Sequence, residues 1–504
     1  MRPSQNLYVC KLLYLGEVPV LERSHSLATA ETVISKDVLE RLLDVEKLKY
    51  CYECGICTGS CPMAELMGKQ YNPRHLLEKI LSNPKEALAS DEFWLCAWCY
   101  RCHRHCNQAL KLPEIFLCMR KLALEHGHER SAEEAFQKIA ENVPLPLVTT
   151  LVCFHPERAG LDIDVVLKKI EQVYEEHLKS ERAKRAQKVA GEKIAVIGSG
   201  PAGLTVAYEL SQKGYGVTVF EALPEAGGML RKCIPNYRLP RQILEREIQL
   251  IKDLGVEMKT GVAVGQDLHF GNLWREGFKA IFVSVGAHKN QKLKIEGTDL
   301  KGVVHALEFL WAFNSGEKVD MGNNVVVIGG GNVAMDAAKT ALKLGAREVT
   351  TLYRRSRDEM PAIPWEVKEA EEAGMKIEFL VSPKRILGEA ERVVGIECVH
   401  VELGEPDESG RKKAMSIAGS EFKRDADMAI LAIGEVPDLE FLPKEVELNE
   451  NGTIWVDPIT METSVKGVFA GGDAVTGPAT VIEAICAGKR AAESISEYLK
   501  SLRK

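Results

Sequence analysis

The stretch that decides the fold is residues 193–203, KIAVIGSGPAG. An apolar run typical of a buried strand leads into glycines spaced as a dinucleotide-binding fingerprint. We predict a helix over Leu204–Lys213 and a second strand in YGVTVFE, which ends at Glu221. Such glycines let a pyrophosphate approach the helix N-terminus, and Glu221 stands where a carboxylate accepts hydrogen bonds from an adenosine ribose. The predicted binding segment is Gly198-Ser199-Gly200-Pro201-Ala202-Gly203.

A second unit of the same kind begins at Asn324 with VVVIGGG. A helix is expected over Asn332–Leu344, followed by the strand EVTTLY. Two nucleotide-binding units more than a hundred residues apart predict two Rossmann-like domains. The second binding segment is Gly329-Gly330-Gly331-Asn332-Val333-Ala334.

The second unit places Arg354 and Arg355 where an acidic residue would otherwise follow the strand. Two guanidinium groups suit the 2′-phosphate of NADP. A charge-assisted hydrogen bond contributes roughly 1.5–3 kcal/mol, which favours NADP over NAD by about ten- to hundredfold per contact. The alternative is that both arginines are surface charges and the chain uses NAD.

The C-terminal stretch VFAGGDAVTGPATVIEAICAGKRAA reads as a strand, a glycine pair, Asp473 and a helix from about Ala479. Asp473 is suited to bond the ribityl or phosphate region of a flavin, and the helix N-terminus would face its pyrimidine ring. The chain must then return to the first nucleotide-binding domain. We therefore expect an FAD domain over residues 191–287 and 431–504, interrupted by an NAD(P) domain over 288–430.

Eight cysteines near the N-terminus form two copies of one spacing, CxxCxxCxxxC, and a proline follows the fourth cysteine of the first copy. This is the ligand spacing of two [4Fe–4S] clusters, in which the fourth cysteine of each run binds the other cluster. Zinc is the alternative metal for CxxC pairs. We assign one cluster to Cys51, Cys54, Cys57 and Cys106, and the other to Cys96, Cys99, Cys102 and Cys61.

The cysteine runs are expected in loops of a small helical domain over residues 1–145. Helices are predicted at Lys36–Leu48, Asn72–Ser82 and Pro113–His128. Residues 146–190 are expected to be a linker, because Asp164–Ala190 is rich in charge and sparse in apolar residues. The fold class is thus α/β: a helical iron–sulfur domain followed by two Rossmann-like domains, one inserted in the other.

Composition sets the remaining limits. A chain of 504 residues should divide into about three domains. A net charge of -7, with 27% charged residues, gives no basic surface for nucleic acid. We see neither a signal peptide nor an apolar run long enough to span a membrane. With 14 cysteines and no secretion signal, thiolate metal binding in the cytoplasm is expected.

Residues 190–504 resemble the flavin-containing small (beta) subunit of glutamate synthase. The motifs that carry the resemblance are Gly227-Gly228-Met229-Leu230-Arg231, Ile234-Pro235-Asn236-Tyr237-Arg238-Leu239-Pro240, Leu352-Tyr353-Arg354-Arg355-Ser356-Arg357 and Gly471-Gly472-Asp473. The resemblance implies that FAD binds through Glu221, Gly228, Leu230, Val262, Asp473 and the residues that open the last helix, Thr480 and Val481. We also expect cofactor contacts from Ala222, Met229, Arg238, Gly286, Gly434 and Gly472.

The N-terminal half departs from that family. Its run Cys54-Gly55-Ile56-Cys57-Thr58-Gly59-Ser60-Cys61-Pro62 instead resembles the iron–sulfur C subunit of heterodisulfide reductase. The combination implies a fused electron-transfer module of an anaerobe's redox complex. We expect a hetero-oligomer whose partner is a ferredoxin-type, 2-oxoacid reductase-type or heterodisulfide reductase-type protein. Glutamate formation would need a large partner subunit.

The predicted function is electron transfer between NADPH and one-electron acceptors through FAD and two [4Fe–4S] clusters. Hydride transfer between nicotinamide C4 and flavin N5 requires no acid, base or nucleophile, so no catalytic side chain is assigned. Open alternatives are flavin-based electron bifurcation, a glutamate synthase small subunit and a non-catalytic cofactor-binding scaffold. A disulfide reductase would need a redox CxxC beside the flavin, where only Cys233 stands.

Overall fold

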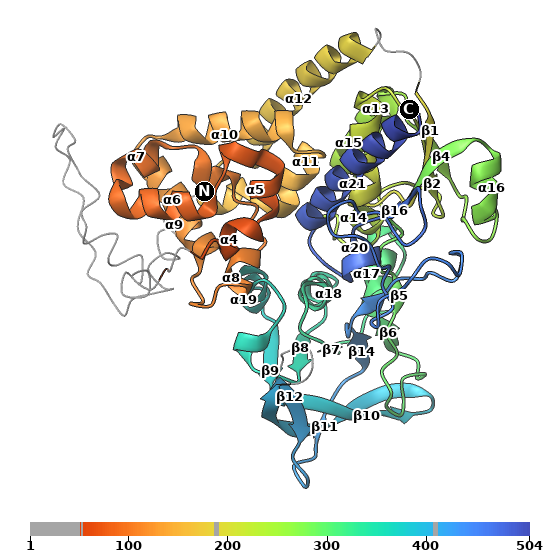
Figure 1. Ribbon diagram of the computed structural model, residues 1–504. Helices are drawn as coiled ribbons and strands as arrows, with labels where there is room; N and C mark the ends of the chain where they lie inside the picture. The colour runs from red at the N-terminus through yellow and green to blue at the C-terminus, as the bar shows by residue number, and fades with distance from the viewer. Residues whose placement is uncertain (1–50, 52–53, 186–190, 407–411, 504) are drawn as a thin grey trace, which may run out of the picture. The chain divides into compact units, whose positions relative to one another are not determined.

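The computed structural model describes residues 51, 54–185, 191–406 and 412–503, which are drawn as solid ribbons in Figure 1. They divide into two compact units. One comprises Met1–Lys188 with Thr480–Cys486, and the other comprises Val189–Ala479 with Ala487–Lys504. The predicted helix over Lys36–Leu48 lies outside the described residues.

The predicted helical character of the iron–sulfur region is confirmed, and helices continue from residue 56 to residue 185. Proline or an asparagine cap begins several of its helices, and Asn72 Oδ1 accepts hydrogen bonds from the backbone N–H groups of Arg74 and His75. Its helical elements are α4 Ile56–Gly59, α5 Pro62–Met67, η2 Gly68–Gln70, α6 Pro73–Ser82, α7 Pro84–Ala89, η3 Glu92–Leu95, α8 Arg101–Arg104, α9 Leu112–Glu125, α10 Glu129–Asn142, α11 Pro146–Thr149, η4 Thr150–Phe154, η5 Pro156–Ala159 and α12 Ile163–Arg185.

Helix α12 differs from the solvated linker that its charge suggested. Its apolar residues recur every four positions, at Val166, Ile170, Tyr174 and Leu178, and all four are buried. A four-residue spacing places side chains on one helix face, which here joins the core of the first unit. The charged residues that suggested a solvated linker lie on the other faces of this helix.

The second unit begins with a parallel sheet in the order β16-β4-β1-β2-β3. The predicted strands and helix lie at β1, α13 and β2, and the residues at the centre of β1 are fully buried. The sheet contains β1 Lys193–Ile197, β2 Gly216–Glu221, β3 Glu257–Thr260, β4 Phe278–Val283 and β16 Val468–Ala470. Its helices are α13 Pro201–Gln212, α14 Met229–Lys232, α15 Arg241–Asp253, α16 Phe270–Arg275, α20 Asp473–Thr476 and, from Ala487 onward, α21 Val481–Ser501.

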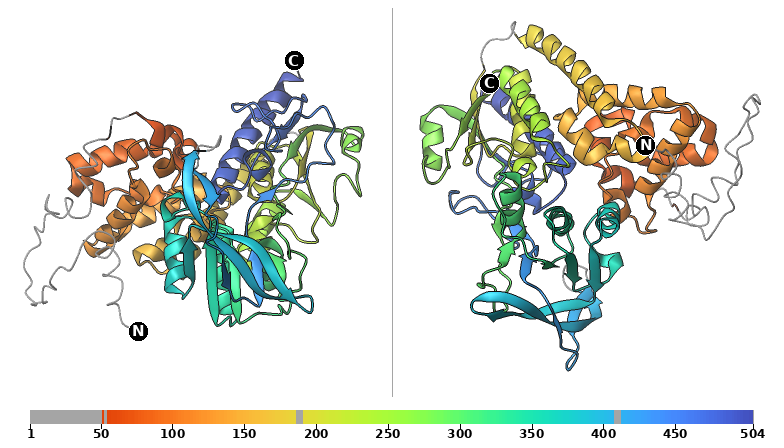
Figure 2. Two further views of the ribbon diagram at one scale, coloured as in Figure 1. Left: turned by 90° about the horizontal axis from the view of Figure 1, so that it is seen from below. Right: turned by 180° about the vertical axis from the view of Figure 1, so that it is seen from behind.

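A second parallel sheet has the order β6-β14-β7-β8-β9. It contains β6 Val303–His305, β7 Asn324–Ile328, β8 Glu348–Tyr353, β9 Lys376–Phe379 and β14 Met428–Leu431, with helices α17 Ala306–Asn314, α18 Asn332–Lys343 and α19 Pro364–Glu372 and the 3-10 turn η6 Arg357–Glu359. A smaller antiparallel sheet follows, whose long ribbon is seen in both views of Figure 2. It contains β10 Val381–Glu389, β11 Arg392–Pro406, β12 Lys412–Ser416 and β13 Phe422–Arg424.

The chain passes between the two parallel sheets twice. The outgoing strand β5 Lys289–Asn290 pairs antiparallel with the returning strand β15 Glu435–Val436. Because β16 then rejoins the first sheet beside β4, the second Rossmann-like domain is inserted in the first. The α/β fold class is confirmed, whereas the residue limits of the domains remain a prediction.

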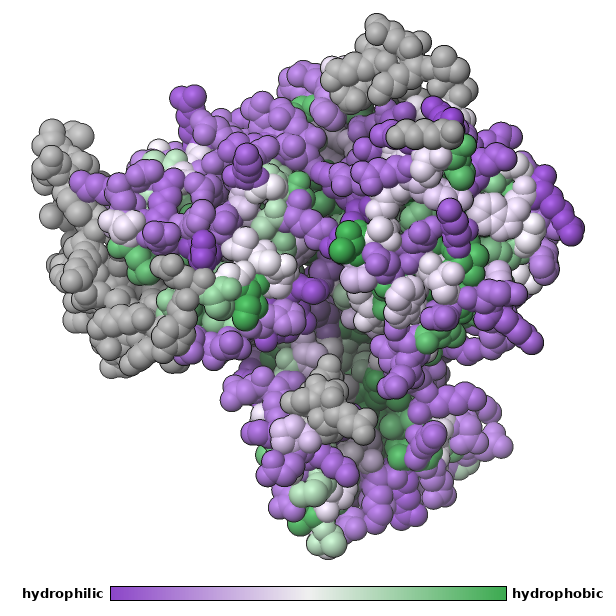
Figure 3. Space-filling view, viewed as in Figure 1, coloured by the Kyte–Doolittle hydropathy of each residue, from purple (hydrophilic) through white to green (hydrophobic). Residues whose placement is uncertain are grey.

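The surface is mixed in character. Polar side chains cover most of the face shown in Figure 3, with small apolar areas between them. Among the residues that the structure describes, no helix has the length and apolar content needed to cross a membrane.

Candidate functional site

The first glycine fingerprint joins β1 to α13. A Cβ added to Gly203 would lie 2.0 Å from the carbonyl oxygen of Gly198, so this glycine permits close packing of the helix against the strand. Gly198 has a φ of +97°, and its added Cβ would lie 2.5 Å from the carbonyl oxygen of Ser284. Gly200 is different, because its Cβ would meet no protein atom within 4 Å. The loop therefore leaves open the position at which a pyrophosphate approaches the backbone.

Glu221 ends β2 and holds this loop in place. Its Oε2 accepts hydrogen bonds from Ser199 N at 3.0 Å and Ser199 Oγ at 2.5 Å, and its Oε1 accepts one from Leu223 N at 2.8 Å. The Ser199 hydroxyl oxygen in turn accepts from Gly227 N at 2.9 Å. The predicted ribose carboxylate is thus buried beside the fingerprint and has a second role in ordering it.

The remaining predicted FAD contacts gather at the carboxyl edge of the first sheet. Gly198, Ala222, Gly286 and Gly472 follow β1, β2, β4 and β16, whose carboxyl ends share one edge because the strands are parallel. This edge is where open α/β sheets bind ligands. The structure thus brings together segments that are nearly 300 positions apart in the sequence.

Besides Gly198, the glycines Gly228, Gly286 and Gly472 along this edge also have positive φ angles. Gly228, at +52°, packs on the fingerprint, since its added Cβ would lie 2.8 Å from Gly200 Cα. Gly286 and Gly472 have φ angles of +69° and +67°. Such backbone favours glycine and brings the main chain close to whatever occupies the edge.

Other predicted residues support the same edge. Met229 and Leu230 open α14, and Val262 N donates a hydrogen bond to the Glu221 carbonyl oxygen at 2.9 Å. Asp473 Oδ1 accepts one from Ala479 N at 3.2 Å, which shapes the approach to α21.

Helix α21 begins with a capping box. Thr480 N donates to Glu483 Oε2 at 3.1 Å, and Glu483 N donates to Thr480 Oγ1 at 3.4 Å. Val481 is the first helical residue. The capping box leaves the other N–H groups of the first turn as the positive end of the helix.

The second fingerprint repeats the geometry of the first. Gly329 has a φ of +145°, and its added Cβ would lie 2.0 Å from the Ala432 carbonyl oxygen. The Cβ of Gly330 would lie 2.4 Å from the Tyr353 ring, whereas that of Gly331 would meet nothing within 4 Å. Asn332, Val333 and Ala334 form the first turn of α18, with Ala334 fully buried, and Gly434 lies beyond β14 at the same edge. Both fingerprints therefore fit a bound dinucleotide.

The predicted arginine pair divides into two roles. Arg354 is exposed just after β8. Arg355 is buried, and its Nε donates to the Lys412 carbonyl oxygen at 2.8 Å. Arg354 is therefore the guanidinium group presented at the position expected for a 2′-phosphate, and Arg355 contacts the neighbouring antiparallel sheet.

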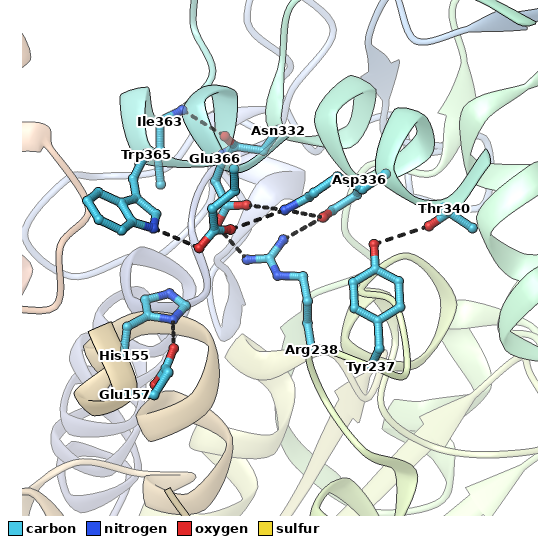
Figure 4. Close-up of polar contacts among 12 residues, drawn as sticks. His155, Glu157, Tyr237, Arg238, Asn332, Asp336, Thr340, Ile363, Trp365 and Glu366 are labelled. Atoms are coloured by element: carbon cyan, nitrogen blue, oxygen red, sulfur yellow. Dashed lines mark hydrogen bonds and ion pairs between the residues drawn. The ribbon is translucent and has the colours of Figure 1, made fainter. Parts of the chain in front are cut away.

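Arg238, predicted as a cofactor contact, lies in a buried charge cluster (Figure 4). Its Nη1 donates to both carboxylate oxygens of Asp336 at 2.7 Å, and its Nη2 donates to Glu366 Oε1 at 3.0 Å. Burial alone would lower the pKa of Arg238, but the two carboxylates outweigh burial and raise it. Lys339 Nζ lies 2.7 Å from Glu366 Oε2 and 3.4 Å from Glu369 Oε2.

These five residues connect a loop of the first Rossmann-like domain to helices α18 and α19 of the second. Sequence reasoning missed the other four residues of this cluster, of which Asp336 and Glu366 bond Arg238 directly. Asp336 and Lys339 read as ordinary charges on a helix, and only their burial in the fold distinguishes them. The cofactor contact of Arg238 remains a prediction, since the structure shows its guanidinium group bonded to carboxylates.

The two cysteine runs have the same local structure. A residue with positive φ, Gly55 at +77° or Tyr100 at +56°, precedes a short helix that carries the third cysteine. Tyr100 is held in this strained region by burial and by edge-on packing against Trp98, with ring centroids 5.9 Å apart. Cys57 and Cys102 therefore lie on helical turns rather than in the predicted loops.

The cysteine thiols form two groups, according to which cysteines influence one another's pKa. Burial raises the pKa of Cys61, and the nearby Cys99 and Cys96 raise it further. Burial also raises the pKa of Cys57, with contributions from Cys51 and Cys54. This proximity fits the predicted crossing of the fourth ligand from the first run to the second group.

All eight predicted ligand cysteines are free thiols. Among the described residues, no three Cys, His, Asp or Glu side chains close on a single-ion site. Backbone N–H groups donate to several of these sulfurs, for instance that of Arg101 to Cys99 and those of Ala64 and Met63 to Cys61. Such donors stabilise the thiolates that a cluster requires.

Comparison with known proteins identifies relatives of this chain. The chain is 48% identical over 314 residues to the NADP(+)-dependent formate dehydrogenase subunit beta of Moorella thermoacetica, covering 62% of this chain and 44% of the relative. It is 39% identical over 413 residues to the NADPH-Fe(3+) oxidoreductase subunit beta of Geobacter sulfurreducens, covering 75% and 61%. The chain thus spans less than two thirds of these two relatives.

The predicted resemblance to glutamate synthase is confirmed. The glutamate synthase [NADPH] small chain of Escherichia coli is 38% identical over 330 residues, covering 62% of this chain and 70% of the relative. The fold also resembles Mycobacterium tuberculosis FprA in complex with NADPH, with a TM-score of 0.53, 20% identity and coverage of 62% and 86%.

Two family descriptions match the chain. Residues 47–110 match a 4Fe-4S dicluster domain. Residues 192–488, more than half of the chain, match the pyridine nucleotide-disulphide oxidoreductase family. This protein therefore belongs to the pyridine nucleotide-disulphide oxidoreductases and carries an N-terminal iron–sulfur domain.

Proposed function

We propose that this chain is the NADPH-dependent electron-transfer subunit of a larger redox complex, moving electrons between NADPH and one-electron acceptors. The observation that carries the proposal is the repeated fingerprint. Gly200 and Gly331 are both open at the carboxyl edges of their sheets, and the same chain holds two cysteine runs. Two dinucleotide sites and cluster ligands in one chain are what conversion between hydride and single electrons requires.

The residues at the two edges have separate tasks. The loop around Gly200, ordered by Glu221 and Ser199, would hold FAD, and the loop around Gly331 with Arg354 would hold NADPH. FAD supplies the exchange between two-electron and one-electron chemistry, and the clusters supply one-electron carriers. The protein's own contribution is binding and orientation, so no acid or base is assigned.

NADPH is favoured over NADH by one feature of the site. Arg354 is exposed just after β8, where an acidic residue would repel the 2′-phosphate. Three of the relatives described above, from Moorella thermoacetica, Geobacter sulfurreducens and Escherichia coli, have NADP(+) or NADPH in their names.

A partner subunit is the expected outlet for the electrons. Three relatives are named as a subunit or chain of a larger protein, and this chain spans only part of the first two. We propose a hetero-oligomer with a protein acceptor or donor, and two [4Fe–4S] clusters bound by the eight cysteines assigned above. Copurification under anaerobic conditions tests for such a partner.

Anaerobic titration tests the function directly. The purified protein is titrated with NADPH and separately with NADH, while flavin absorbance and the EPR signals of the clusters are recorded. Bleaching of the flavin by NADPH and appearance of reduced-cluster signals are expected. Reduction by NADH alone would contradict the NADPH assignment, and failure of both nucleotides to reduce bound flavin would favour a cofactor-binding scaffold.

A further inference from the structure

A buried arginine lies against the second cysteine run. Arg120, on α9, is 1% exposed. Its Nη2 donates to the carbonyl oxygen of Cys96 at 2.6 Å and to that of Trp94 at 3.1 Å. The other two bonds reach the carbonyl oxygens of Phe93 at 3.1 Å and Phe154 at 2.7 Å. The guanidinium group also lies over the Trp94 ring, 5.5 Å from its centroid.

The charge of Arg120 has no directly bonded carboxylate. Within the described part of the chain, all its hydrogen bonds go to neutral carbonyl oxygens. Glu157 attracts it from further away, but that carboxylate is 43% exposed and bonds His155. A buried cation without an ion-pair partner is costly, so such an arrangement calls for a compensating negative charge nearby.

The hydrogen bond from Arg120 Nη2 to the Cys96 carbonyl oxygen, at 2.6 Å, places the guanidinium group beside one predicted cluster ligand. Burial lowers the pKa of Arg120, and Cys96 is the first of the groups that oppose this shift. Tyr71 is buried, with 2% of its surface exposed. Its hydroxyl group makes a hydrogen bond with the Cys96 sulfur. One predicted cluster ligand is therefore approached by a fixed cation and by a hydroxyl donor.

The described cysteines of the first group are more exposed to solvent. Cys54 is exposed, and Cys51 and Cys57 are partly exposed, whereas Cys96 and Cys102 are buried. Water and salt screen charge around the exposed group, but a charge beside the buried group acts through a medium of low dielectric. The effect of Arg120 should accordingly be concentrated on one cluster.

We propose that Arg120 and Tyr71 raise the reduction potential of the cluster ligated by Cys96, and so set it apart from the other cluster. Reduction adds one electron and makes the cluster with its four thiolates one unit more negative, without forming or breaking a bond. A fixed positive charge and a hydrogen bond to a ligand sulfur both favour that added charge. This inference rests on the proposed function, because it requires clusters in the cysteine runs.

Redox titration monitored by EPR tests the inference in the full-length holoprotein. Arg120→Met removes the charge, Arg120→Lys keeps it with fewer hydrogen bonds, and Tyr71→Phe removes only the hydroxyl group. Arg130→Met is the matched control, because Arg130 is an 88% exposed arginine of the same unit. Iron content and circular dichroism establish that each variant is loaded and folded.

Arg120→Met is expected to change the reduction equilibrium of one cluster at least tenfold, a lowering of about 59 mV for a one-electron couple. Tyr71→Phe should lower the same midpoint by a smaller amount, and Arg120→Lys should retain most of the wild-type value. The other cluster and the Arg130→Met variant should show little change. If the Arg120→Met protein does not bind its clusters, the midpoint potentials of the Tyr71→Phe and Arg120→Lys variants provide the test.

Unchanged midpoints in loaded Arg120→Met and Tyr71→Phe proteins would overturn the inference and leave Arg120 as a structural residue that binds carbonyl groups. The proposed function would then stand, since the wild-type clusters would still be reduced. Absence of any [4Fe–4S] signal from reconstituted wild-type protein would instead overturn both. Equal shifts in Arg120→Met and Arg130→Met would also contradict the specific role of Arg120.

Discussion

Replacing Arg238 with methionine should destabilise the second unit strongly. Arg238, Asp336 and Glu366 have side chains that are 19%, 6% and 3% exposed, so water screens this cluster poorly. The substitution removes three hydrogen bonds from Asp336 and Glu366, which Lys339 also contacts. Removal of one partner from a buried ion pair costs about 3–5 kcal/mol.

The expected loss can be expressed as a melting temperature. A change of 1 kcal/mol shifts the Tm of a domain of 150–250 residues by about 2–4 °C, so the Arg238→Met variant should melt at least about 6 °C lower. Differential scanning calorimetry of the FAD-loaded, full-length protein measures this shift. Arg392→Met is the control, because Arg392 and Asp320 form an ion pair that is 63% and 91% exposed and should contribute about 1 kcal/mol or less.

A second substitution identifies the cause. In an Asp336→Asn background, Arg238→Met should cost less, because part of the unpaired buried charge is already gone. Equal Tm losses for Arg238→Met and Arg392→Met would refute the reasoning. So would an Arg238→Met loss that is the same with and without Asp336, since the two charges would then be uncoupled.

Four further outcomes are expected. Arg354→Ala should lower the preference for NADPH over NADH by about tenfold or more, measured as the ratio of kcat/KM values with an artificial acceptor. Gly200→Ala should leave the fold intact, because its Cβ meets no protein atom within 4 Å, but should weaken FAD retention on gel filtration. Cys61→Ser should alter the same EPR signal as Cys99→Ser if the fourth ligand crosses between the runs. Burial raises the pKa of Glu435 above the ordinary 4.5, so ionising it costs stability as pH rises above that value; Glu435→Gln should therefore raise the Tm more at pH 8 than at pH 5.

The sequence by itself determined the elements whose signals are local. Each fingerprint encodes a strand, a tight turn and a helix within about a dozen residues, because the glycines at the turn allow backbone that other residues cannot adopt. The structure places β1 and α13, and later β7 and α18, at the positions that the glycine spacing predicted. The cysteine runs are equally local, since each run falls within eleven residues, 51–61 and 96–106.

The tertiary structure decided the roles of charged residues. Arg354 and Arg355 are adjacent and identical in type, but one is exposed and the other bonds a carbonyl group 57 positions away. Helix α12 looked like a solvated linker because charge density does not reveal which face finds a partner. The sequence pattern shows which side chains are charged. The burial of each charged side chain and the group that it bonds are properties of the folded chain.

Arg120 and Arg238 show the same limit most clearly. Nothing in their local sequence distinguishes an arginine that bonds four carbonyl groups from one that joins two domains. Their partners lie between 24 and 128 positions away along the chain. The sequence determined which cofactor classes this protein can bind, and the fold decided which buried charges surround those sites, because the energy of a charge depends on its distance from other charges and from water.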